Sequence, residues 1–317
     1  MPKAELSIIM PLYNSEKFIA AAVESLLSQS YGDFELIIVN DGSTDGSLDV
    51  LSQFKDKRIN VLHNTSNQGI VYSRNKGLAV ATGAFVAPFD ADDIAMPGKF
   101  RLQIDFLKKN PHFGMVGSWV KIIDEHGNLL KKRWKLNARP EQISAILLFR
   151  NYFVQSAVTM RHDAIPKHGY RPGYDLVEDW MMWHEIAVRY PVWNLPQYLV
   201  KYRLHEHGNS QKDQELLRQK DKMIFDSLFL KMGIQPTNED FELYYLIKNQ
   251  QPVIHHKLKE IEGLLSRIAE ENSKSGLYDQ KQLVRVLQNR WLKACFKTRN
   301  KIYRVPFDFL SSGLLHF

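Results

Sequence analysis

The sequence predicts an α/β fold with a mainly parallel central sheet, followed by a helical C-terminal region. Over residues 1–107, short runs rich in Ile and Val alternate with segments whose apolar residues recur at helical spacing. Strands that alternate with helices form parallel sheets with right-handed crossovers. One strand-like run passes directly into three Asp residues, and after residue 210 the pattern becomes helical. These three observations define the fold class.

Four strands are expected in the N-terminal part, and all are short and apolar, as strands buried on both faces are. They lie at residues 6–10, 34–39, 59–62 and 84–89. Ligands of parallel sheets bind outside the carboxyl ends of the strands. This rule predicts that the loops at 11–14, 40–44 and 90–93 lie side by side.

Helices are expected between these strands and after them. Apolar residues at 18–27 have helical spacing, and Asn14-Ser15 is expected to cap that helix. Further helices are expected after Thr44-Asp45, over 69–81, and after Asp93, which is expected to cap the helix that follows it.

The acids Asp90, Asp92 and Asp93 follow the fourth strand directly. Hard cations prefer oxygen ligands, and often use one or two carboxylates together with substrate phosphates. A helix cap is the alternative role. The first strand runs into Pro11-Leu-Tyr-Asn14, without the Gly-x-Gly-x-x-Gly of dinucleotide-binding folds, and there is no Walker loop. A metal is therefore expected to hold any bound diphosphate.

Six motifs occur in order: Ile9-Met-Pro-Leu-Tyr-Asn14, Ile38-Val-Asn-Asp-Gly-Ser-Thr-Asp45, Arg74-Asn75 with Gly77, Asp90-Ala-Asp-Asp93, Glu178-Asp-Trp180 and Tyr202-Arg-Leu-His205. The ordered set resembles the inverting glycosyltransferases of family two, over about residues 5–210. This resemblance implies the GT-A fold and a nucleotide-diphosphate-sugar donor. The stretch from Tyr198 to His205 is most similar to bacterial lipooligosaccharide transferases that add β-1,3-linked N-acetylhexosamine.

The resemblance also implies a division of the chain. A catalytic domain at 1–210 would contain a nucleotide-binding part at 1–107 and an acceptor part at 108–210. Residues 211–317 would form a helical region with a basic tail.

The resemblance assigns donor binding to residues at the strand ends: Pro11, Leu12, Tyr13, Asn14, Asp41, Arg74, Asp90, Ala91 and Asp92. Tyr13 is expected to stack on uracil, or else to be a half-buried aromatic. Asp41 is expected to accept a hydrogen bond from the uracil ring NH, or else to form a turn. Arg74 would contact the nucleotide or be a solvated helix residue. Asp90 would reach the ribose or the metal.

The implied metal is Mn²⁺ or Mg²⁺, bound by Asp92 and bridging the diphosphate as a Lewis acid. His205 is expected to complete the site, and His207 is the alternative.

Asp179 is the expected general base, which takes a proton from the acceptor hydroxyl and yields a β product from an α-linked donor. The alternative is that Glu178 and Asp179 only stabilise a helix N-terminus. Gln155, Ser156 and Glu178 are expected near the acceptor or the sugar. This chain has Val154-Gln155 where similar enzymes have a His-Asn pair, so the choice of sugar stays open.

Composition favours a soluble globular protein, with 44% hydrophobic and 24% charged residues. No run approaches the roughly 18 apolar residues of a membrane span. The N-terminus lacks a secretory signal pattern, and the single Cys295 suits a reducing compartment. We therefore expect a cytoplasmic protein.

Charge is concentrated in the tail. Residues 281–304 contain eight Lys or Arg and no acid, whereas the whole chain carries +7, so the remainder is nearly neutral. A basic amphipathic helix with Trp291 suits an anionic membrane surface, which would place the protein at the inner face of the cell membrane. A packed helix and a homodimer contact are alternatives. Nucleic-acid binding is not expected, because the charge is confined to one tail.

The predicted function is transfer of N-acetylglucosamine, in β-1,3 linkage, from a UDP-sugar to a galactose-terminated acceptor glycan of bacterial lipooligosaccharide or surface polysaccharide. β-Galactosyl- and N-acetylgalactosaminyltransferases of the same fold are alternatives. A sugar nucleotidyltransferase would need a Gly-rich N-terminal loop, which is missing here. A non-catalytic nucleotide-sugar-binding homologue would not need the base Asp179.

Overall fold

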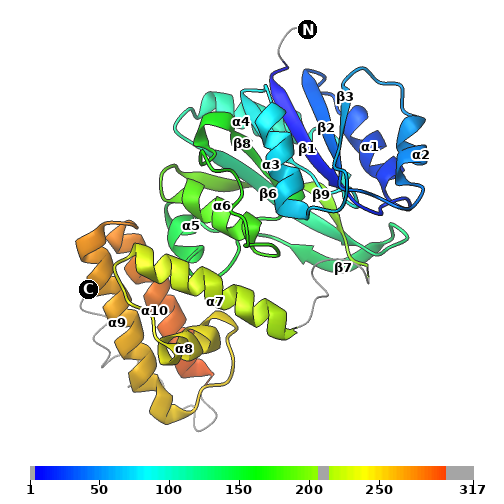
Figure 1. The fold of residues 1–317 in the computed structure, drawn as a ribbon. Helices are drawn as coiled ribbons and strands as arrows, with labels where there is room; N and C mark the ends of the chain where they lie inside the picture. The colour runs from blue at the N-terminus through cyan, green and yellow to red at the C-terminus, as the bar shows by residue number, and fades with distance from the viewer. Residues whose placement is uncertain (1–3, 206–213, 298–317) are drawn as a thin grey trace. The chain divides into compact units, whose positions relative to one another are not determined.

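The computed structural model describes residues 4–205 and 214–297, and the chain forms two compact units. Unit 1 comprises residues 1–140 and 151–214, and unit 2 comprises 141–150 and 215–317. Unit 1 contains a sheet with helices on its two faces, and unit 2 is helical (Figure 1). The assignment of 141–150 to unit 2 was not expected from the sequence.

The sheet of unit 1 has the strand order β3-β2-β1-β4-β8-β6-β9-β5, with β7 paired to β6. Strands β1 to β4 are parallel neighbours, whereas β8 is antiparallel to both β4 and β6. The four expected strands are present within two residues of their predicted bounds. The strands are β1 (Leu6–Leu12), β2 (Phe34–Asn40), β3 (Ile59–His63), β4 (Phe85–Pro88), β5 (Ile94–Ala95), β6 (Met115–Ile123), β7 (Leu129–Trp134), β8 (Thr159–Arg161) and β9 (Val192–Arg203).

The expected helices of unit 1 form, but two expected caps do not. The helices are α1 (Ile19–Leu27), α2 (Ser47–Ser52), α3 (Ile70–Val80), α4 (Lys99–Lys109) and α6 (Glu178–Ala187). The prediction that Asn14-Ser15 caps α1 is wrong, because a backbone turn at Ser15 precedes the helix and its N-cap is Phe18. The prediction that Asp93 caps α4 is also wrong, since that helix follows Gly98 and Asp93 binds elsewhere.

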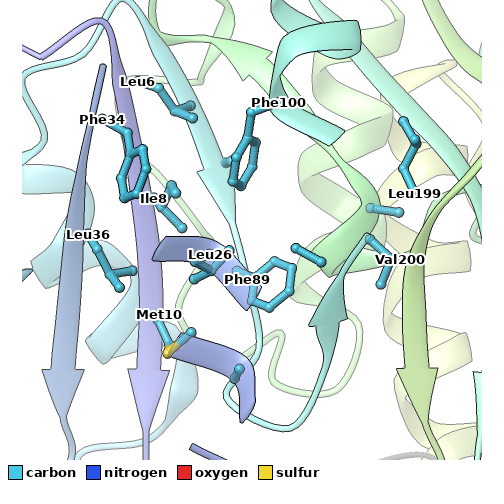
Figure 2. Close-up of a cluster of buried hydrophobic side chains, with 14 of the residues drawn as sticks. Leu6, Ile8, Met10, Leu26, Phe34, Leu36, Phe89, Phe100, Leu199 and Val200 are labelled. Atoms are coloured by element: carbon cyan, nitrogen blue, oxygen red, sulfur yellow. The ribbon is translucent and has the colours of Figure 1, made fainter. Parts of the chain in front are cut away.

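The two faces of β1 bury different neighbours. Leu6, Ile8 and Met10 join a cluster with Leu26 of α1 and Phe100 of α4 (Figure 2). The alternate residue Ile9 faces α3 on the other side of the sheet. There a Cβ added to Gly77 would lie 2.5 Å from Ile9 Cγ2, so only glycine allows α3 to approach this closely. Helices on both faces leave the carboxyl ends of the strands as the place for a ligand.

Unit 2 consists of α5 (Pro140–Ile146), α7 (Gln214–Lys231), α8 (Asn238–Lys248), α9 (Leu258–Ser275) and α10 (Gln280–Phe296). The basic tail begins as α10, whose apolar side chains Leu283, Leu287 and Trp291 are buried, and this helix contacts α9. The packed-helix alternative therefore describes residues 281–297, and residues 298–304 lie outside the described part. None of the described helices is long and apolar enough to cross a membrane.

Candidate active site

Three loops meet at one edge of the sheet, as the strand pattern predicts. The strands β2, β1 and β4 are parallel neighbours, so the loops that follow them share an edge. Asn14 adopts a left-handed backbone conformation with φ 46°. Its side-chain Oδ1 accepts a hydrogen bond from the Thr44 N–H at 2.8 Å. This bond ties the first loop to the second.

The predicted donor-binding residues of the first and third loops differ in exposure. Tyr13 is 47% exposed, so its ring can meet a ligand. Leu12 is fully buried and Pro11 is half-buried at the end of β1, while Ala91 is buried. These three can therefore offer mainly backbone atoms.

Asp41 organises the loop that leads into α3. Its Oδ1 accepts hydrogen bonds from Asn64 Nδ2 at 2.7 Å and from the Gln68 N–H at 2.8 Å. Its Oδ2 accepts from the Gly69 N–H at 2.9 Å. A carboxylate has about four acceptor positions, so Oδ2 retains capacity for one more donor.

Arg74 is buried, with 3% exposure, and joins three elements of unit 1, so it is not the solvated helix residue of the alternative prediction. Its Nη2 lies 2.9 Å from Asp90 Oδ1, and its Nη1 forms an ion pair with Glu178. Its guanidinium also lies 5.5 Å from the centre of the Tyr170 ring. Because buried charges require partners, this triad fixes the position of α6 against the loop after β4.

Asp92 and His205 form a pair at the same edge, with 2.8 Å between Asp92 Oδ2 and His205 Nε2. Their side chains keep 28% and 12% exposure. The neighbouring residues hold this pair in place. Asp93 Oδ1 accepts from the Arg203 N–H at 2.9 Å, and Arg203 Nε donates to the Asp92 carbonyl at 2.7 Å. His207 lies outside the described residues.

The pair fits a divalent cation that shares its coordination with a substrate. One carboxylate oxygen and one imidazole nitrogen are suitable ligands for Mn²⁺, and Asp90 begins the same loop. Across the described ranges, no group of three or more His, Cys, Asp or Glu residues could hold a metal by itself. A cation at this pair would thus need further ligands such as phosphate oxygens and water.

Asp179 begins α6 next to Glu178. Its Oδ2 accepts a hydrogen bond from Asn151 Nδ2 at 2.7 Å. Its Oδ1 accepts a hydrogen bond from the Trp180 N–H at 2.6 Å. Burial and the adjacent Glu178 charge raise the pKa of Asp179 to about 7, against the opposing effects of Arg74 and the hydrogen bonds. A carboxyl group with a pKa near 7 is suited to general-base chemistry at neutral pH.

Burial also changes the pKa of two other acids of the site, Asp90 and Asp93. Burial raises the pKa of Asp90, which the Arg74 charge opposes. Burial, and then the charges of Asp92 and Asp90, raise the pKa of Asp93 well above its usual range.

Three further predicted residues surround these acids. Gln155 Nε2 donates to the Tyr170 hydroxyl at 3.0 Å. Ser156 is fully buried, and its Oγ accepts from the Asp90 N–H at 3.0 Å. Within the described ranges, the buried atoms Arg74 Nε, Gln155 Oε1 and Glu178 Oε2 have no hydrogen-bond partner. Unpaired buried polar atoms clustered at a site are expected where a polar ligand completes them.

Several structural contributors were not predicted. Asn151 carries no sequence signal, because only the fold brings it to Asp179. Arg203 stands inside a recognised motif, Tyr202-Arg-Leu-His205, yet its role in holding the Asp92 loop was not foreseen. Asp93 was expected at a helix terminus and instead anchors the end of β9.

The known proteins that are similar to this chain are glycosyltransferases. The family model described as glycosyl transferase family 2 matches residues 7–169. An uncharacterized glycosyltransferase of Haemophilus influenzae is 34% identical over 216 residues, which cover 65% of this chain and 67% of that one. The Escherichia coli enzyme UDP-Glc:alpha-D-GlcNAc-diphosphoundecaprenol beta-1,3-glucosyltransferase WfgD is 32% identical over 219 residues, 68% of this chain and 84% of that one.

Solved structures of glycosyltransferases share the fold. Staphylococcus aureus TarS 1–349 in complex with UDP-GlcNAc superposes with a TM-score of 0.61 at 15% identity, covering 96% of this chain and 88% of that one. The mannosyltransferase PcManGT from Pyrobaculum calidifontis, in complex with GDP-Man and Mn²⁺, gives 0.57 at 17% identity, with 93% and 87% covered. The protein is therefore a glycosyltransferase with the GT-A fold, and its chain belongs to glycosyl transferase family 2.

Proposed function

We propose that this protein is a metal-dependent, inverting glycosyltransferase that moves N-acetylglucosamine from a UDP-sugar to a galactose-terminated acceptor. The product would be a β-1,3 linkage in bacterial lipooligosaccharide or surface polysaccharide. One observation carries the proposal: Arg74 bridges Asp90, in the loop of the cation pair, to Glu178, the neighbour of the candidate base Asp179. This network supports one site that contains both the proposed cation ligands and the proposed base.

The UDP part of the proposal is supported by residues and by similar proteins. Tyr13 presents an exposed ring for uracil, and Asp41 Oδ2 retains capacity to accept a hydrogen bond from the uracil NH. WfgD is named for a UDP-glucose donor, and the TarS structure contains UDP-GlcNAc. Together these favour a uridine nucleotide as the donor.

Asp179 acts as the base in the proposed reaction. It accepts the proton of the acceptor hydroxyl as that oxygen attacks the anomeric carbon from the face opposite UDP, which inverts the configuration. Asn151 orients the carboxylate through its 2.7 Å hydrogen bond. A divalent cation at Asp92 and His205 would neutralise the charge of the departing diphosphate. A positioned base typically contributes about 10²–10⁴-fold to the rate.

The sugar would be recognised by the unpaired buried atoms of the site. We propose that Gln155 and Glu178 bind sugar hydroxyl or amide groups, and that Ser156 positions Asp90. Pocket contacts that discriminate similar sugars are often worth only about 1–3 kcal/mol each. β-Galactosyl and N-acetylgalactosaminyl transfer are therefore the alternatives to test.

The test is a panel of UDP-sugars with lactose-type acceptors, with and without Mn²⁺, followed by NMR of the product linkage. Asp179→Asn should keep UDP affinity while transfer falls by about 10²–10⁴-fold. Asp163→Asn, which changes an exposed acid, is the matched control. An α-linked product, or an active Asp179→Asn enzyme, would refute the mechanism. UDP binding without any transfer would identify a non-catalytic homologue.

The basic tail at 281–304 is proposed to attract the protein to the inner face of the membrane through its cations, of which Lys281, Arg285, Lys293 and Lys297 are exposed. The buried apolar face of α10 leaves these cations as the main source of affinity. High salt should then release the protein from anionic vesicles. Equal binding to neutral vesicles, or a concentration-dependent homodimer formed through the tail, would exclude this role.

A further inference from the structure

One face of the sheet in unit 1 carries a row of cations on three neighbouring strands. Lys121 of β6 lies in register with Arg133 of β7 on one side and with Lys201 of β9 on the other. Residues directly opposite one another project from the same face, and like charges at such positions destabilise a sheet. A bound anion would relieve the repulsion between these cations.

In the described part of the chain, no Asp or Glu forms an ion pair with the cations of this row. The ion pairs found in unit 1 involve other side chains. Among the described residues, Arg133 donates to the backbone carbonyls of Leu130 and Lys132. The side chains of all three cations of the row are half-buried.

Two half-buried aromatic side chains adjoin this row. Trp119 is two residues before Lys121 on the same face of β6, and its ring centre lies 5.4 Å from that of Tyr198 on β9. Lys135 Nζ lies 5.4 Å from the Trp119 ring centre, and Lys121 Nζ lies 5.8 Å from that of Tyr198. Rings flanked by ammonium groups can pack against sugars, while the ammonium groups bind an anion that is attached to those sugars.

The same face leads to the candidate base. A Cβ added to Gly117, two residues before Trp119, would lie 2.8 Å from Phe153 Cδ1. The Phe153 N–H donates to Asn151 Oδ1, and Asn151 Nδ2 binds Asp179. At about 3.3 Å per residue of strand, the cation row begins roughly 13 Å beyond Gly117. The sugars of an acceptor glycan can span the distance between Gly117 and the cation row.

We propose that this face, defined by Trp119, Lys121, Arg133, Lys135, Tyr198 and Lys201, binds a diphosphate group that joins the acceptor glycan to its lipid carrier. The inference rests on the proposed function, because transfer defines the acceptor. The aromatic pair contacts the sugars nearest the reacting hydroxyl, and the cations bind the phosphate oxygens. Three of the four cations, Lys121, Arg133 and Lys201, are half-buried, which favours this single ligand over a planar membrane surface, because membrane contact needs exposed side chains.

The experiment compares two synthetic acceptors that end in the same galactosyl disaccharide. One continues through a neutral ether into a short alkyl chain, and the other through a diphosphate. The wild-type enzyme should show a higher kcat/KM for the diphosphate acceptor. Lys121→Gln and Lys201→Gln should each reduce this preference about tenfold, which corresponds to about 1.4 kcal/mol. Lys121→Arg should retain the preference.

The control Lys55→Gln/Lys57→Gln removes the same charge from exposed positions elsewhere in unit 1 and should retain the preference. Equal kcat/KM values for the two acceptors, or the same loss in the control, would overturn the proposal. A third result would also overturn it: the Lys121 and Lys201 variants lose binding to phosphatidylglycerol vesicles but keep the acceptor preference. The face would then contact a membrane.

A failure of the proposed function is separable from a failure of this inference. An enzyme that neither hydrolyses UDP-sugars nor transfers to either acceptor would remove the proposed function. Calorimetric titration of the protein with each of the two acceptors, without donor, would still test whether this face binds diphosphate. Binding of the diphosphate acceptor that is lost in Lys121→Gln/Lys201→Gln supports the site, and absence of such binding overturns it.

Discussion

The hydrogen bond from Asn151 to Asp179 provides a direct test of the proposed base. It reaches a carboxyl group whose pKa is held at about 7 by burial and by Glu178, and it favours the ionised form. A hydrogen bond to a charged group contributes about 1.5–3 kcal/mol, and one pKa unit corresponds to about 1.36 kcal/mol. Asn151→Ala should therefore raise the pKa of Asp179 by about 1–2 units, to about 8–9.

The sign of the effect on rate follows from the role of the carboxylate. A base must be deprotonated, so kcat/KM should rise with pH through the pKa of Asp179 in the free enzyme. At pH 7 about half of the wild-type enzyme carries the ionised base, against roughly 1–10% of the variant. Activity at pH 7 should then fall roughly 5–50-fold and recover at alkaline pH. Glu178 and Arg74, the charged groups that face Asp179, are unchanged in the variant.

The assay is the pH profile of kcat/KM with saturating Mn²⁺, measured for the wild type, Asn151→Ala and the exposed-site control Asn60→Ala. The control should reproduce the wild-type profile. A loss of activity in Asn151→Ala that is equal at every pH would indicate a purely structural role for Asn151. An unshifted acidic limb would show that Asp179 is not the titrating base.

Three other outcomes are expected. Tyr13→Ala should weaken UDP binding by about 1–3 kcal/mol in calorimetry, whereas Tyr72→Ala, which removes an equally exposed ring from α3, should not. His205→Ala should raise the Mn²⁺ concentration for half-maximal activity at least about tenfold, and an unchanged Mn²⁺ titration would remove His205 from the site. Arg74→Met should reduce the free energy of unfolding by about 3–5 kcal/mol, because the buried Glu178 and the half-buried Asp90 lose their partner. Lys108→Met, at an exposed ion pair, should reduce it by less than about 1 kcal/mol in the same denaturant titration; equal losses would contradict the reasoning.

The first half of unit 1 could be predicted from the sequence because its strands are buried on both faces. Strands β1 to β4 are short apolar runs separated by helical patterns, so both their existence and their common edge followed. The strands β6 and β9 were not predicted. Each mixes buried positions with aromatic and basic ones, such as Trp119, Lys121 and Lys201, and β9 also contains Pro196. This pattern lacks a continuous apolar run and resembles neither a fully buried strand nor a helix.

The positions of the candidate residues were more predictable than the contacts between them. The topology rule placed Asn14 and Asp92 in loops at one edge of the sheet, and the parallel strands confirm this placement. The ion pair of Arg74 with Glu178 spans 104 positions, and the hydrogen bond from the Arg203 N–H to Asp93 spans 110. No local pattern encodes such pairings, because they depend on how the strands pack. Sequence reasoning therefore assigned Asp93 to the nearest helix.

The pairing of Asp92 with His205 across 113 positions has a consequence during synthesis. A growing polypeptide exposes the nucleotide half of the sheet long before β9 leaves the ribosome. Until β9 pairs with β5 and β6, the histidine has no fixed place beside the aspartate. The proposed cation site is consequently complete only after the last strand has been added to the sheet.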